Sequence, residues 1–235
     1  MNKLISLELK RNSLRSYHIA VMISTVSLLA LLYLFAAIPK MDASETELDM
    51  FMSYQSLTGL ISIISMAVFT VLSSVMSTKF IVEEYAGKRA VLLFSYPVER
   101  RKILGAKIGM IFLYTVVSMI LCGTVVFAVF FFTESISPLC AEPLNAQIIA
   151  GCFLSLICDS LLAGVWGILA LWFGFEKQSV TVTMIAAVIL SVVMCQVMAM
   201  TLNFPAGGFA LLIAGAAGAF LVFHSLIRKV EQMEV

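Results

Sequence analysis

The most unusual chemical group in this 235-residue chain is the carboxyl of Asp159, near the middle of a long apolar stretch at residues 148–173. If that stretch crosses a membrane, an acid at its centre costs at least about 2.5–3.5 kcal/mol and is a candidate functional group. One interpretation makes Asp159 the proton carrier of a secondary transporter. The other makes it a hydrogen-bonding link to a neighbouring helix. The sequence leaves both interpretations open.

The other candidate groups offer little catalytic chemistry. Glu83-Glu84 and His224 resemble parts of the motifs of CAAX-type intramembrane proteases, but Lys88 stands where that motif has arginine. A metal site needs converging ligands, and the second histidine, His18, opens a different apolar stretch. The five cysteines lack a metal-ligand spacing and are interpreted as packing residues. We therefore predict that the chain is not an enzyme and binds no cofactor or metal itself.

A second concentration of informative residues is the segment at residues 79–107, which separates two apolar stretches. The preceding helix is expected to continue to Tyr85 and to end at Gly87, and Pro97 suits the first turn of the next helix. Between them, residues 90–94 are all apolar and have basic residues on both sides. Such a run needs a lipid surface or a protein partner. We interpret it as a short helix that lies in the headgroup layer or docks on a soluble protein.

This segment resembles the signature of ABC-2 type permeases, the six-span membrane subunits of bacterial ATP-binding-cassette exporters. In that family an acidic pair ends the second helix, a coupling helix follows, and Ser-x-Pro-[Val/Ile]-x-Arg opens the third helix. The match covers residues 83–107, with Gly87-Lys88 where many members have Gly-Thr. The resemblance implies that the ATPase is coupled through Glu83, Glu84, Lys88, Arg89, Leu92, Leu93, Phe94, Pro97, Arg100 and Arg101.

The resemblance also implies partners. No Walker A loop is present, because Gly87-Lys88 is followed by Arg89 and no glycine precedes them at the required spacing. ATP and Mg²⁺ are therefore expected on a separate nucleotide-binding subunit. A second permease subunit, identical or different, is expected to complete the membrane part. Relatives of this kind export amphipathic toxin peptides such as phenol-soluble modulins, lantibiotics or drugs, which makes such a compound the expected substrate.

These groups must be positioned by membrane-spanning helices, because 61% of the residues are hydrophobic and only 12% are charged. Fourteen of the fifteen Lys and Arg residues fall on one side if the chain crosses the membrane six times with both termini inside; Lys40 is the exception. Glu134 is expected in an outer loop. The sequence thus predicts one all-α membrane domain at residues 1–235 and gives no support for nucleic-acid binding; the resemblance implies that the membrane is a bacterial plasma membrane. The spans are expected at residues 17–38, 57–78, 108–132, 148–173, 180–202 and 208–227.

Two helix faces are candidates for the translocation path, together with Asp159. One is a stripe of hydroxyls and one aromatic ring in the second span, at a spacing of three and four residues. The other is a methionine stripe in the fifth span, which would adapt to varied apolar substrates. Packing between helices is the alternative for both stripes. The candidates are Ser62, Ser65, Phe69, Ser73, Met184, Met194 and Met198.

Overall fold

A computed structural model describes residues 14–41, 53–85, 100–136, 145–201 and 205–232 of the chain, and all regular structure in these ranges is helical. The helices are α2 (Arg15–Met41), α3 (Tyr54–Ser77), α6 (Arg100–Ile136), α7 (Ala146–Lys177), α8 (Val180–Thr201) and α9 (Pro205–Gln232). After α3 the chain continues as a π-helix, η2 (Thr78–Val82), and one further turn, α4 (Glu83–Tyr85). Six helices are long and apolar enough to cross a membrane, which confirms the predicted number within the described ranges.

The helices extend beyond the predicted spans, because the apolar stretch is shorter than the helix that contains it. The third span was expected at residues 108–132, whereas α6 begins at Arg100 and ends at Ile136. The extra turns carry charged residues at both ends. One consequence is a correction: Glu134, expected in an outer loop, lies inside α6 and is only 2% exposed. Its Oε1 accepts a 2.8 Å hydrogen bond from the Tyr54 hydroxyl.

The ends of the helices follow from local sequence. Pro205 occupies the first position of α9, where a missing N–H costs nothing. Between α7 and α8, Gln178 adopts the left-handed conformation (φ 48°, ψ 38°). The Ser179 N–H donates to the Gly174 carbonyl at 3.1 Å, and the Gln178 N–H donates to Phe175 at 3.4 Å. This pair of hydrogen bonds is a Schellman motif, which turns the chain sharply.

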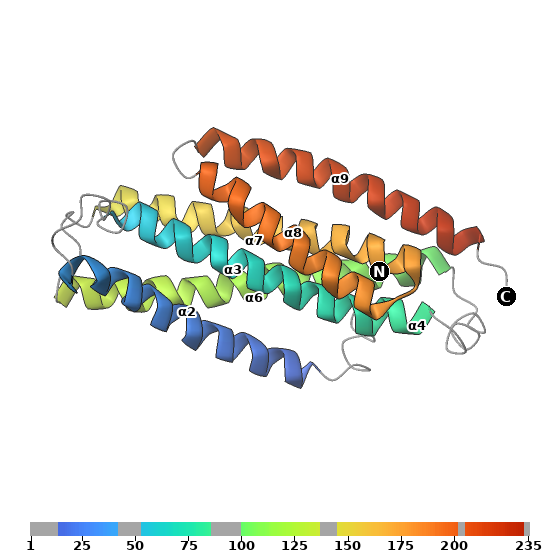
Figure 1. Cartoon of the computed structure of the whole chain (residues 1–235), viewed down its shortest axis with the longest axis horizontal. Helices are drawn as coiled ribbons and strands as arrows, with labels where there is room; N and C mark the ends of the chain where they lie inside the picture. The colour runs from blue at the N-terminus through green and yellow to red at the C-terminus, as the bar shows by residue number, and fades with distance from the viewer. Residues whose placement is uncertain (1–13, 42–52, 86–99, 137–144, 202–204, 233–235) are drawn as a thin grey trace.

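Helix α7 occupies the centre of the bundle, where it packs against α3, α6, α8 and α9. Figure 1 shows α2 and α9 on opposite sides of the other helices. Helices α3 and α7 run in the same direction. In two close contacts between them, the paired residues are 94 positions apart in the sequence. The Thr58 hydroxyl lies 3.0 Å from the Cys152 thiol, and Ser73 lies so close to Gly167 that an added Cβ would be 2.7 Å from the Ser73 Cβ. A small residue is therefore required where these two helices touch.

The outward faces of the bundle are apolar. Among the described residues, the exposed large hydrophobic side chains of the peripheral helices include Met22 and Val26 on α2, Ile189 on α8 and Phe220 on α9. Such faces are unfavourable in water and suit the hydrocarbon of a bilayer. With the six spans, they indicate a multi-pass membrane protein.

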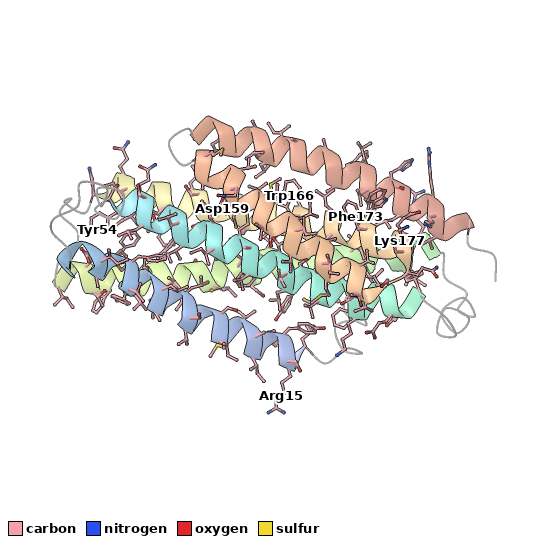
Figure 2. All side chains as sticks on the ribbon, in the orientation of Figure 1. Arg15, Tyr54, Asp159, Trp166, Phe173 and Lys177 are labelled. Carbon is pink, nitrogen blue, oxygen red and sulfur yellow. The ribbon has the colours of Figure 1, made fainter. Side chains whose placement is uncertain are left out.

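The two ends of the bundle differ in charge. Helix α4 ends, α6 starts, and α7 and α9 end at the same end of the molecule (Figure 1). The described ranges place Lys79, Arg101, Lys102, Lys177 and Lys229 in the terminal turns at this end. We call it the basic end; the opposite end, where Tyr54 lies, we call the Tyr54 end (Figure 2).

Candidate functional site

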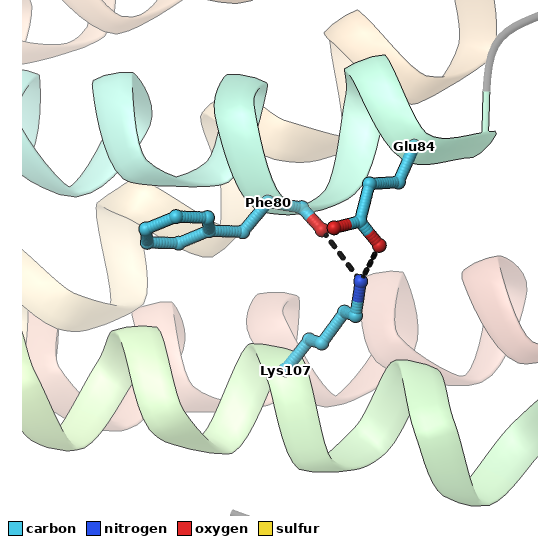
Figure 3. Close-up of polar contacts among 3 residues, drawn as sticks. All are labelled: Phe80, Glu84 and Lys107. Atoms are coloured by element: carbon cyan, nitrogen blue, oxygen red, sulfur yellow. Dashed lines mark hydrogen bonds and ion pairs between the residues drawn. The ribbon is translucent and has the colours of Figure 1, made fainter. Parts of the chain in front are cut away.

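Near the basic end, a lysine is buried completely between two helices. Lys107 lies two turns inside α6 and has no exposed surface. Its ammonium group pairs with the Glu84 carboxylate of α4 and donates a 2.9 Å hydrogen bond to the Phe80 carbonyl of η2 (Figure 3). We call these three groups the Lys107 clamp. It joins the two helices that flank residues 86–99.

The π-helix places both acceptors of the clamp. A π-turn takes one more residue than an α-turn and disturbs the regular ladder of backbone hydrogen bonds, and such turns recur at functional sites. Here the turn spans Thr78–Val82, so the Phe80 carbonyl lies within it and Glu84 comes just after it. The residue after Glu84, Tyr85, packs its ring edge-on against Phe175 of α7. The clamp is therefore embedded in an apolar cluster.

The structure places only part of the predicted coupling residues. Glu84 is partly buried in the clamp, whereas Glu83 and Arg101 are exposed at the basic end. Arg100 is the first residue of α6. The remainder lie outside the described residues: Lys88, Arg89, Leu92, Leu93, Phe94 and Pro97.

In the half of the bundle toward the Tyr54 end, a cavity of about 540 Å³ opens between α3, α7, α8 and α9. Its size is typical of sites for small organic ligands. Three predicted path residues from three helices meet there: Ser62, Asp159 and Met198. The exposed residues Gln55 and Asn145 also line it, at the Tyr54 end of the bundle. Asp159 itself lies about 20 Å from the start of α7 (Figure 2).

Two buried polar side chains, Asp159 and Ser62, line the cavity. Asp159 is 5% exposed, and no described lysine, arginine or histidine forms an ion pair with it. Ser62 is 2% exposed, and its Oγ has no hydrogen-bond partner among the described residues. Buried polar groups are normally satisfied, so two such groups facing one cavity call for an explanation.

The other path candidates do not line this cavity. Ser65, Phe69 and Ser73 are buried between helices, and the Ser65 hydroxyl donates to the Ser62 carbonyl at 2.8 Å. Met184 is partly buried on α8, and Met194 packs against the apolar core at the Tyr54 end. The serines, Phe69 and Met194 therefore pack between helices.

Cysteine and histidine residues form no cluster in the part of the chain that the structure describes. The four cysteines within the described ranges are free, and two of them, Cys152 and Cys158, line the cavity. His18 Nδ1 lies 3.1 Å from the Tyr114 hydroxyl of α6. Across the described ranges, no three His, Cys, Asp or Glu side chains gather to hold a metal ion.

Sequence reasoning missed the role of Lys107, which it counted as one more base of the coupling segment. A signal was available, because Lys107 is followed by mostly apolar residues in the helix. The cavity itself could not be predicted, since its walls come from four helices that are distant in the sequence.

The chain was compared with known proteins. It is 26% identical over 187 residues, 80% of each chain, to a protein of Bacillus subtilis (strain 168) described as "Uncharacterized protein YcbO". No family model matches the chain, and no solved structure matches it.

Proposed function

We propose that the chain is the permease subunit of an ABC-2 type exporter in a bacterial plasma membrane. In this role, it couples ATP hydrolysis by a separate nucleotide-binding subunit to the export of an amphipathic or lipophilic substrate. The resemblance of residues 83–107 suggests the family, and the six apolar helices agree with it. A second permease subunit completes the transporter.

The observation that carries the proposal is the Lys107 clamp. The proposed docking residues lie between α4 and α6, and the clamp ties these two helices together immediately beside them. A buried ion pair with an additional carbonyl acceptor resists separation, because opening it leaves a charge in an apolar cluster. A force applied to residues 86–99 would therefore move α3 and α6 as one unit. Such a rigid connection is what a coupling element requires.

The test replaces Leu92 and Leu93 with aspartate. If these side chains fill a groove on the ATPase, two buried, unpaired charges cost several kcal/mol, and about 1.4 kcal/mol is a tenfold loss of affinity. Detergent-solubilised protein should then lose the co-purified ATPase and its substrate-stimulated ATP hydrolysis. The matched control, Lys177→Asp/Gln178→Asp, adds two acids at exposed positions of the same end and should retain both.

Retention of a stoichiometric, fully stimulated ATPase by Leu92→Asp/Leu93→Asp protein would contradict the proposal. It would favour the interpretation that this segment lies on the lipid surface, because a helix lifted from the bilayer leaves a bound ATPase in place.

A second function, proton-coupled secondary transport, is favoured by one observation: Asp159 lines a cavity and forms no ion pair with a described residue. The variant Asp159→Asn distinguishes the two functions, since the amide preserves polarity but carries no proton. Proton coupling predicts loss of transport at normal expression. Transport that survives in Asp159→Asn but stops without ATP would exclude the secondary transporter.

A further inference from the structure

We propose that the cavity at the Tyr54 end is a binding site for an organic ammonium group attached to an apolar body, with Asp159 as its counter-ion and Ser62 as a hydrogen-bond acceptor. The inference goes beyond the proposed function, because it concerns what this chain binds and requires no ATPase. It rests on two buried side chains that line one cavity: the Ser62 hydroxyl has no hydrogen-bond partner among the described residues, and the Asp159 carboxyl forms no ion pair with a described residue.

The polar groups select the charge of the ligand. A carboxylate accepts hydrogen bonds and attracts a cation, and a hydroxyl can accept one as well. No described base competes for Asp159, and none of the cavity-lining residues is a lysine, arginine or histidine. An anionic ligand would find no countercharge there, whereas an ammonium group would neutralise the acid in a setting of low polarity.

The apolar residues that line the cavity indicate what the rest of the ligand, apart from its ammonium group, is like. The apolar lining residues include Ile63, Ile148, Leu154, Met198 and Phe209, from all four helices that form the cavity. Methionine adapts to varied shapes, and a volume of about 540 Å³ holds a group of small-drug size. The site therefore suits an alkyl or aromatic chain that carries one amine.

The opening of the cavity indicates how such a molecule enters. Leu154 is 55% exposed, and the neighbouring Ser155 and Gly151 are exposed too, so one side of the cavity faces the surroundings of α7. Gln55 and Asn145 provide polar groups toward the Tyr54 end. An amphipathic amine would enter with its apolar part along the lipid and its charge toward water. Both an aminophospholipid and a soluble amine have this chemistry.

The native thiol of Cys158 provides a reporter, because it is partly exposed, lines the cavity and precedes Asp159. Cys158 is kept as the sole cysteine, with Cys152→Ser preserving the hydrogen bond to Thr58. Its modification by a trimethylammonium methanethiosulfonate is compared with that by the sulfonate analogue. Relative to Ile136→Cys, an exposed thiol at the same end, we expect about a tenfold preference for the cationic reagent.

Two variants test whether Asp159 causes that preference. Asp159→Asn should abolish it, and Asp159→Glu should retain it, so a folding failure of the amide variant leaves the acid variant and the parent chain to decide. Each variant is first checked for monodisperse elution. Octylammonium should slow modification of Cys158 in the parent but not in Asp159→Asn, and the uncharged analogue 1-octanol should protect neither.

Two bilayers distinguish the sources of the amine. If phosphatidylethanolamine nanodiscs slow modification by themselves compared with phosphatidylglycerol nanodiscs, the ligand is an aminophospholipid; if only added octylammonium protects, it is a soluble amine. Equal rates for the two reagents in the parent chain, or equal protection by octanol and octylammonium, would overturn the proposal. Because no ATPase is present, these results are independent of the docking test.

Discussion

The Lys107 clamp leads to an asymmetric prediction. Lys107 is fully buried, whereas the Glu84 side chain retains 18% of its exposure. Glu84→Gln leaves a buried ammonium group that contacts only a neutral amide and the Phe80 carbonyl. Breaking a buried pair lowers the free energy of unfolding by about 3–5 kcal/mol, and we expect a value in the upper part of this range. Lys107→Met leaves a carboxylate that can still reach water. Its cost should be clearly smaller, about 1–3 kcal/mol.

The double variant Glu84→Gln/Lys107→Met completes the cycle. With both charges absent it should regain most of the lost stability, because an apolar replacement of a buried pair is often neutral. The free energy of unfolding of the four proteins is measured by denaturation in detergent, with the helical circular dichroism signal as the readout. Equal effects of the two single substitutions, or a cost below about 1 kcal/mol for Glu84→Gln, would refute the buried geometry on which the reasoning depends.

Three further predictions follow from other features. A cysteine at Gln147 should react with a membrane-impermeant thiol reagent in intact cells and one at Arg101 should not; labelling at Arg101 from outside would reverse the proposed orientation. Gly167→Ala should lower thermal stability because its Cβ would meet the facing serine of α3, whereas Gly109→Ala, which has open space, should be neutral or stabilising by up to about 1 kcal/mol. Gln178→Gly should stabilise the α7–α8 turn by about 0.5–1 kcal/mol, as the left-handed backbone favours glycine, and a lower melting temperature would contradict this reasoning.

The helices were predictable because each one needs about 20 apolar residues in succession, a local property of the sequence. The continuation of the second span to Tyr85 was also predicted, and the helical turns through α4 confirm it. The error was the assignment of Glu134 to an outer loop. Hydropathy marks the part of a helix that suits hydrocarbon, and α6 continues past that part and past Glu134 to Ile136. A charged residue therefore does not mark the end of a helix.

Contacts between helices could not be predicted in the same way. Asp159 was identified as unusual from its position alone, but its surroundings depend on α3, α8 and α9 packing against α7. The parallel contact of α3 and α7 brings Thr58 beside Cys152, which are 94 residues apart. Small and hydroxylated residues occur on several faces of these helices. The sequence therefore does not state which face meets which partner.

The π-helix at Thr78–Val82 also determines the direction in which the next residues of the helix point around its axis. It absorbs one extra residue, so if the turn relaxed to α-geometry, Glu84 would rotate by about 100° around the helix axis. Glu83, now exposed, would then take the angular position that Glu84 holds beside Lys107. The acidic pair thus offers a carboxylate to the same ammonium group in either phase. Deleting one residue of the turn should keep Glu84 in place, and the stability of that deletion with Glu84→Gln or Glu83→Gln would reveal which acid Lys107 uses.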